Sequence, residues 1–147
     1  MEKWKRNITA GNECFNNNQL ISALAHYQCA KSRAKQLLGN WFNAEQAVAA
    51  VVISYHNLAD LYHREGYFKL EQRELRDVYL FVLSALENST SGKVSTDSPD
   101  GEHQALVRAA MRCRQSLMRH CKRYPDLIPE QEEVQVSLPQ LLASACH

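Results

Sequence analysis

Apolar side chains recur at steps of three and four residues along most of this chain, which is the spacing of one face of an α-helix. The pattern is clearest over residues 19–38 and 42–64, and both stretches are longer than an ordinary strand. Only 5 glycines and 4 prolines occur, too few for the many turns of a β-sandwich or barrel. The sequence therefore predicts an all-α fold.

Turn-forming residues divide this pattern into successive helices. The breaks fall at the Asn16–Asn18 triplet, at Gly39-Asn40, at Gly66 and in the polar stretch 89–101, which predicts a loop. The expected helices cover residues 3–16, 19–38, 42–64, 68–87 and 102–123, with a short amphipathic helix over 138–145. Short turns between consecutive helices make them antiparallel neighbours, so we expect an array of helix hairpins.

Length and composition describe an ordinary globular chain. Its 147 residues fit one domain, and 45% hydrophobic with 22% charged residues is a typical balance. No run approaches the ~20 apolar residues of a membrane span, and no secretory signal begins the sequence. Five cysteines follow no CxxC or paired spacing. We therefore expect a cytoplasmic protein with reduced thiols and no membrane partner.

Small and aromatic residues recur at fixed offsets in the first four helices. They are Gly11, Phe15, Ala23, Tyr27 and Ala30 in one pair, and Asn57-Leu58-Ala59, Tyr62, Gly66-Tyr67-Phe68 and Leu75 in the next. These offsets resemble the tetratricopeptide repeat, a helix pair of about 34 residues. The resemblance covers residues 4 to 87, with unit one over 3–38, unit two over 42–87, and a cap and tail over 102–147.

The resemblance implies close packing at the crossing of each pair. Gly11 and Ala23 are expected where the two helices of unit one approach most closely, with Tyr27 filling the gap towards unit two. Several features depart from the family pattern, including Cys14 in place of a tyrosine and the lack of a proline closing either unit. Glu71 stands where a small residue is usual, and the equivalent residues 11 and 59 are 48 positions apart (59 − 11), which makes the repeat elongated.

In this family the first helix of each pair lines a groove that binds peptides. Carried over, this predicts a protein- or peptide-binding face, formed by Lys5, Ile8, Asn12, Phe15, Asn16, Ile53, His56, Asn57, Asp60, His63 and Arg64. Some members clamp a peptide carboxylate with asparagines and lysines; Asn12 and Asn57 match the asparagine offsets, but Ile8 replaces a lysine. A strict carboxylate clamp is therefore not predicted. The alternative interpretation is that both asparagines only satisfy contacts between helices.

The fifth expected helix is the most basic segment of a chain whose net charge is +1. Its arginines Arg108, Arg112, Arg119 and Arg123 fall within a sector of about 60° at 100° per residue. Such a ridge suits phosphates or another polyanion, which makes a polyanion-binding regulator the second hypothesis. The alternative is a solvated outer face, and no recognition motif favours nucleic acid.

Catalytic signatures are missing from the sequence, so we expect a binding protein without a cofactor and not an enzyme. A third hypothesis is a metal site, because one face of the third expected helix carries His56, Asp60 and His63. The two histidines are separated by about 10.5 Å of helix rise, which argues against a shared ion. Two repeat units bury their stacking faces poorly, so we expect a cap formed by the fifth helix or a homodimer.

Overall fold

The computed structural model describes residues 1–91 and 100–127. They form five helices: α1 (Glu2–Asn16), α2 (Leu20–Leu37), α3 (Ala44–Arg64), α4 (Phe68–Ser91) and α5 (Asp100–Arg123). No strand occurs within these described ranges, so the predicted all-α class is confirmed. The helix expected over 138–145 lies outside the described residues.

Left-handed backbone conformations mark the helix ends that the sequence predicted. Asn18 (φ 59°), Gly39 (φ 87°) and Gly66 (φ 79°) each lie in the turn after a helix. Asparagine and glycine tolerate this conformation better than other residues, which explains why α1, α2 and α3 end there. Helix α3 begins two residues later than expected because the side chain of Asn43 caps it, accepting a hydrogen bond of 3.0 Å from the Gln46 backbone N–H.

Both ends of the predicted polar loop are helical, and residues 92–99 between them lie outside the described residues. Helix α4 continues to Ser91 and α5 begins at Asp100, so residues at both ends of the expected loop 89–101 are helical. The hydroxyl of Ser89 donates a hydrogen bond of 2.7 Å to the carbonyl of Leu86, an arrangement that lets serine continue a helix. Polar composition alone therefore did not mark where α4 ends and α5 begins.

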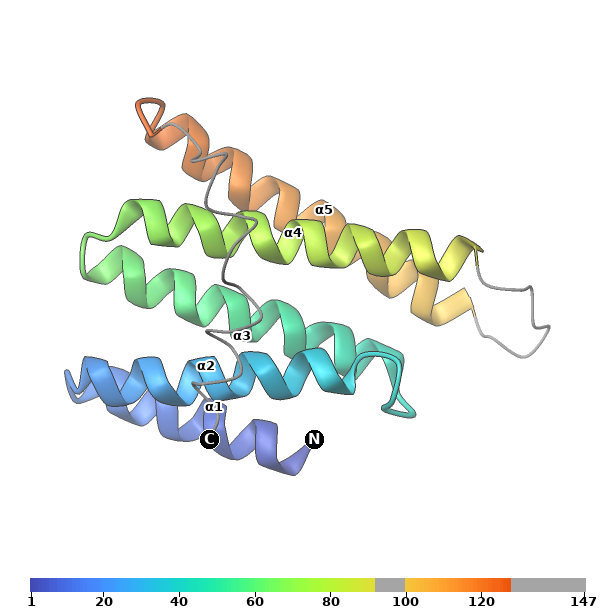
Figure 1. Ribbon diagram of the computed structural model, residues 1–147, viewed down its shortest axis with the longest axis horizontal. Coiled ribbons are helices and arrows are strands. Elements are labelled where there is room, and N and C mark those ends of the chain that lie inside the picture. Colours follow the sequence, from blue (N-terminus) through green and yellow to red (C-terminus); the bar gives the residue numbers. More distant parts are fainter. Residues whose placement is uncertain (92–99, 128–147) are drawn as a thin grey trace, which may run out of the picture.

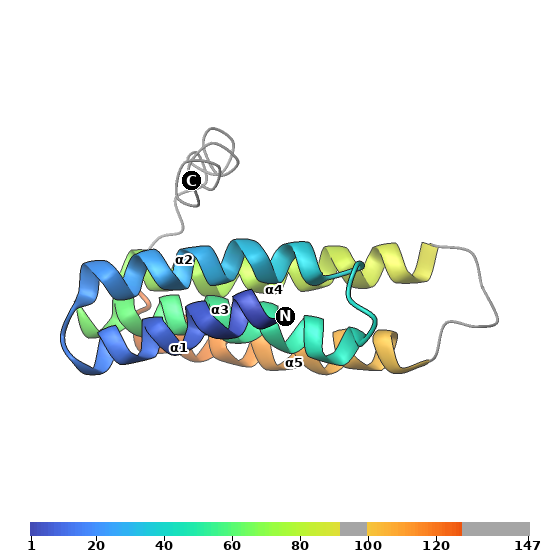
Figure 2. The ribbon, with the colours of Figure 1, turned by 90° about the horizontal axis from the view of Figure 1, so that it is seen from below.

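The helices form two layers (Figure 2). Helices α2 and α4 lie in one layer, and α1, α3 and α5 lie in the other, so that consecutive helices cross between layers (Figures 1 and 2). Each helix is antiparallel to the next, whereas α1, α3 and α5 run in the same direction. Helix α5 covers α3 and α4 at one end of the stack.

Two hydrophobic clusters hold the layers together. The larger one joins α3, α4 and α5 through residues that include Val51, Val78, Val82, Leu106 and Cys113. The smaller one joins α2 and α3 through Ala23, Tyr27, Leu58 and Leu61, with Ile8 and Phe15 of α1 packed against it. Both clusters follow the helical periodicity of the sequence.

Gly11 confirms the predicted close crossing in the first helix pair. A Cβ atom at this position would lie 2.5 Å from Cε1 of Tyr27, whose ring is 3% exposed. The ring therefore occupies the space that any larger residue at position 11 would need. Tyr27 also packs against Leu58 and Leu61, so it fills the gap towards the next helix pair as expected.

Candidate functional site

Helices α1, α3 and α5 present one surface, which we call the α1/α3/α5 face. Helix α3 lies in its middle and contributes the exposed residues Ile53, Asp60 and Arg64. Ile53 keeps 41% of its surface exposed although it belongs to an otherwise strongly buried helix. An isolated exposed isoleucine is ordinary on a protein surface, so the neighbouring groups decide whether this face is a site.

Side-chain contacts between α3 and α5 fix which side of α5 belongs to the face. Arg108 Nη2 lies 3.2 Å from Glu45 Oε1 at the beginning of α3. Further along, His56 Nε2 lies 3.3 Å from Ser116 Oγ. These two contacts align the parallel helices and direct the Arg108 side of α5 towards α3.

The arginines that the sequence predicts on one side of the fifth helix therefore lie on the α1/α3/α5 face. Arg112 and Arg119 follow Arg108 by four and eleven residues, which places them on the same side of α5. Both are exposed, and neither forms an ion pair within the described residues. Arg123 lies against the ring of Tyr124, 5.4 Å from its centroid. The two sets of residues predicted separately thus share one surface.

Several predicted groove residues are engaged in contacts that hold α1 on the stack. Arg64 Nη1 donates a hydrogen bond of 2.9 Å to the carbonyl of Phe15, and Nη2 donates to Asn18. The guanidinium of Arg64 also covers the Phe15 ring, 4.7 Å from its centroid. Phe15, which the sequence analysis placed on the binding face, is therefore a partly buried residue that packs against the smaller hydrophobic cluster and beneath Arg64.

The asparagines predicted for the face differ in their surroundings. Asn12 accepts a hydrogen bond of 2.7 Å from the Tyr27 hydroxyl, as the alternative interpretation of this residue expected. Asn57 is half-buried, and Asn16 is exposed at the end of α1. Lys5 is exposed and lies 3.6 Å from Glu2. Ile8 belongs to the smaller hydrophobic cluster, so it contributes to packing.

A cluster of histidines and aromatic rings closes one end of the face. Glu71 Oε2 lies 3.1 Å from His63 Nδ1 and 3.2 Å from His120 Nε2. Phe68 packs between His63 and Tyr124, with ring centroids 5.6 Å and 4.4 Å away. His120 is 5% exposed, and its Nε2 lies close to Glu71 without forming a hydrogen bond. This cluster joins α3, α4 and α5.

Asp60 lies near this cluster, and the pKa of its carboxyl is raised. Desolvation by the surrounding groups raises the pKa of its carboxyl, and the charge of Glu71 raises it further. His56 and His63 act in the opposite direction. Part of the side chain remains exposed, so Asp60 is an acceptor available to a partner.

The residues of the metal hypothesis do not come together as a ligand set. His56 Nδ1 lies 2.8 Å from the Val52 carbonyl, whereas His63 faces Glu71. Within residues 1–91 and 100–127, no three His, Cys, Asp or Glu side chains are arranged to hold a metal ion. The two histidines instead connect α3 to α5 and α4.

Sequence reasoning missed the buried pair Lys31 and Glu74, and it missed the contacts of Glu71 with His63 and His120. Lys31 of α2 donates hydrogen bonds of 3.2 and 3.1 Å to both carboxylate oxygens of Glu74 in α4, and both residues are buried. Desolvation raises the pKa of the Glu74 carboxyl, while Lys31 lowers it. A signal existed, because Lys31 lies on the same helix face as Tyr27 and Ala34. Glu71 was noticed only as a departure from the repeat pattern.

Fold and contacts define the protein as an all-α array of antiparallel helix hairpins. The chain belongs to the family described as Protein of unknown function (DUF2753), whose profile matches residues 2–140. Comparison with curated proteins found no match, and comparison with solved structures found none either. No described helix has both the length and the apolarity that crossing a membrane requires.

Proposed function

We propose that the protein is a tetratricopeptide-like adaptor that binds an acidic segment of a partner protein on the α1/α3/α5 face. The observation that carries the proposal is the pair Arg112 and Arg119, which lie exposed and without an ion pair in the described residues. They lie beside the α3 surface that exposes Ile53. Binding, rather than catalysis, is the role that this surface supports.

The chemistry of the face suits a peptide that combines carboxylates with one apolar side chain. Guanidinium groups bind carboxylates in a bidentate geometry, which gives direction as well as affinity. Ile53 offers an apolar contact, and an apolar contact surrounded by polar groups is the usual composition of a protein interface. Asn16, Asn57 and Asp60 supply hydrogen-bonding groups. The cytosol is the proposed compartment because the cysteines follow no disulfide pattern.

The test compares partner capture by the wild type and by the double variant Arg112→Glu/Arg119→Glu. A matched control, Arg6→Glu/Arg114→Glu, makes the same charge change at exposed positions outside the face. Arg114 follows Arg112 by two residues and so projects about 200° away around the helix. We expect a partner that binds the wild type and the control but not the first variant. Equal capture by all three proteins would refute the assignment of this face.

The same arginines support the second candidate function, binding of a polyanion such as nucleic acid. It predicts binding of heparin or duplex DNA that weakens steeply with salt, because each neutralised phosphate releases counterions. Arg112→Glu/Arg119→Glu would abolish this binding. Ile53→Asp would weaken it only as far as one added negative charge repels the polyanion. A partner lost in Ile53→Asp and insensitive to polyanion competition favours the adaptor.

A further inference from the structure

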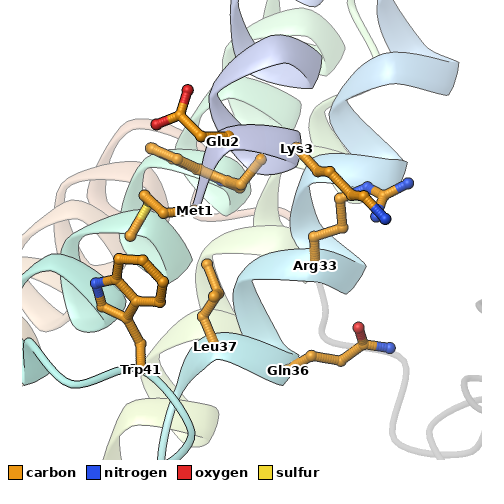
Figure 3. Close-up of a pocket in the computed structure, with 8 residues that line it drawn as sticks. Met1, Glu2, Lys3, Arg33, Gln36, Leu37 and Trp41 are labelled. Carbon is orange, nitrogen blue, oxygen red and sulfur yellow. The ribbon is translucent and has the colours of Figure 1, made fainter.

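A cleft opens where the beginning of α1 meets the end of α2, and none of the residues that line it belongs to the proposed partner site. Its volume is about 510 Å³. The lining residues are Met1, Glu2, Lys3, Trp4, Arg33, Gln36, Leu37 and Trp41 (Figure 3). They come from α1, from α2 and from the connection to α3, so only the folded chain forms the cleft.

The apolar part of the cleft consists of both tryptophans of the chain and Leu37. Each indole is held in place by its N–H group. Trp4 Nε1 donates a hydrogen bond of 2.8 Å to Ser54 Oγ, and Trp41 Nε1 donates one of 3.0 Å to Gln46 Oε1. The N–H groups are occupied, which leaves the rings as apolar surfaces fixed before a ligand arrives.

The polar part of the cleft is cationic. Lys3 and Arg33 lie together on one side, and Trp41 lies on the opposite side (Figure 3). Both cations are exposed, and neither forms an ion pair within the described residues. Glu2 is the acidic residue of the lining, and its carboxylate lies 3.6 Å from Lys5. The cleft therefore offers two cations beside fixed aromatic rings.

We propose that this cleft binds a small aromatic carboxylate. The carboxylate would lie between Lys3 and Arg33, and the ring would lie against Trp4, Leu37 and Trp41. The volume is within the range of about 300–1,000 Å³ that is common for small-molecule sites. Indole rings attract an aromatic ligand ring, and a guanidinium favours a carboxylate group.

The tryptophans provide a direct measurement, because the chain has no others and both line the cleft. The probe is 3-phenylpropanoate, whose phenyl ring does not absorb where indole is excited at its red edge. From its size we expect a saturable change in tryptophan emission with a dissociation constant on the order of 1 mM. The neutral isostere 3-phenylpropanamide tests the contribution of the ligand's negative charge. The anion acetate, which has no ring, tests the contribution of the phenyl group.

Variants at exposed positions identify the charge that matters without disturbing the core. We expect Arg33→Gln and Lys3→Gln to weaken binding of 3-phenylpropanoate by about tenfold each, since each loses a charged contact. Arg33→Lys should retain more affinity than Arg33→Gln. The matched control Arg6→Gln removes a cation from exposed α1 surface outside the cleft and should leave affinity unchanged. Far-UV circular dichroism confirms that each variant is folded.

Three results would overturn the proposal. The first is no saturable change with the folded wild type, and the second is equal affinity for 3-phenylpropanoate and its amide. The third is that acetyl-Gly-Phe, a peptide with a free carboxylate, binds more than about tenfold tighter than 3-phenylpropanoate, which would assign the cleft to peptide ends. Comparable affinity for the peptide and the free acid supports the small-molecule assignment. None of these results depends on the partner-binding face.

Discussion

Substitution of Gly11 by alanine separates helix propensity from packing at the crossing of α1 and α2. At an exposed helix position, replacing glycine by alanine stabilises the folded state by about 1 kcal/mol, because glycine loses more backbone freedom on folding than alanine does. Here the new Cβ would lie 2.5 and 2.6 Å from two ring atoms of buried Tyr27. Overpacking of this kind costs about 1–3 kcal/mol.

Displacement of the ring also weakens the hydrogen bond from the Tyr27 hydroxyl to Asn12, which contributes about 1 kcal/mol. The packing cost and the lost hydrogen bond total about 2–4 kcal/mol, against a propensity gain of about 1 kcal/mol. We therefore expect Gly11→Ala to lower the free energy of unfolding by about 1–3 kcal/mol. Urea denaturation followed by circular dichroism measures this change.

Two control variants make the origin of the effect testable. Thr9→Ala, at an exposed position of the same helix, should raise stability by about 0.5 kcal/mol from propensity alone. In a Tyr27→Leu background the ring is gone, so Gly11→Ala should become neutral or stabilising. A stabilisation of about 1 kcal/mol in the wild type, or an equal loss in the Tyr27→Leu background, would refute the packing argument.

The other predictions concern buried charge, pH and thiol reactivity. Lys31→Met leaves Glu74 buried without its cation, so it should lower the free energy of unfolding, measured by urea denaturation, by about 3–5 kcal/mol. The double variant Lys31→Met/Glu74→Leu should lose less stability, and equal losses in the two variants would contradict this. Because the pKa of Asp60 is raised in the folded protein, its unfavourable contribution to stability is absent below its ordinary pKa of 3.8 and develops as pH rises through the folded pKa. Asp60→Asn should therefore gain stability relative to the wild type between acidic and neutral pH, and a constant difference would contradict this. Burial raises the pKa of the Cys113 thiol to about 11, so peptide mapping after brief iodoacetamide treatment should find exposed Cys121 alkylated and Cys113 protected.

Much of the fold was predictable because helices are encoded by neighbouring residues. The spacing of Leu20, Ala23, Leu24 and Tyr27 indicated α2, and Gly39 and Gly66 indicated the ends of α2 and α3. The extension of α4 to Ser91 was not predictable from the polar composition of this stretch, since serine continues the helix there.

The candidate site was predictable only as two separate sets of residues. Helical periodicity placed Arg108, Arg112 and Arg119 on one side of α5, and the repeat resemblance placed Ile53 and Asp60 on one side of α3. Neither pattern states how α5 is rotated against α3. That rotation follows from packing around Leu106 and Cys113, which are far in sequence from the α3 residues they contact.

The sequence by itself determined most of the helices and the turns between them, because these depend on residues a few positions apart. The close crossing at Gly11 was expected only from the repeat resemblance, since Gly11 and Tyr27 lie in different helices. Tertiary structure alone decided that Arg64 holds Phe15, that Glu71 lies between His63 and His120, and that Trp4 and Trp41 line one cleft. These contacts join different helices or loops, so they depend on the angle and register at which helices pack. Side-chain packing over the whole array sets both quantities.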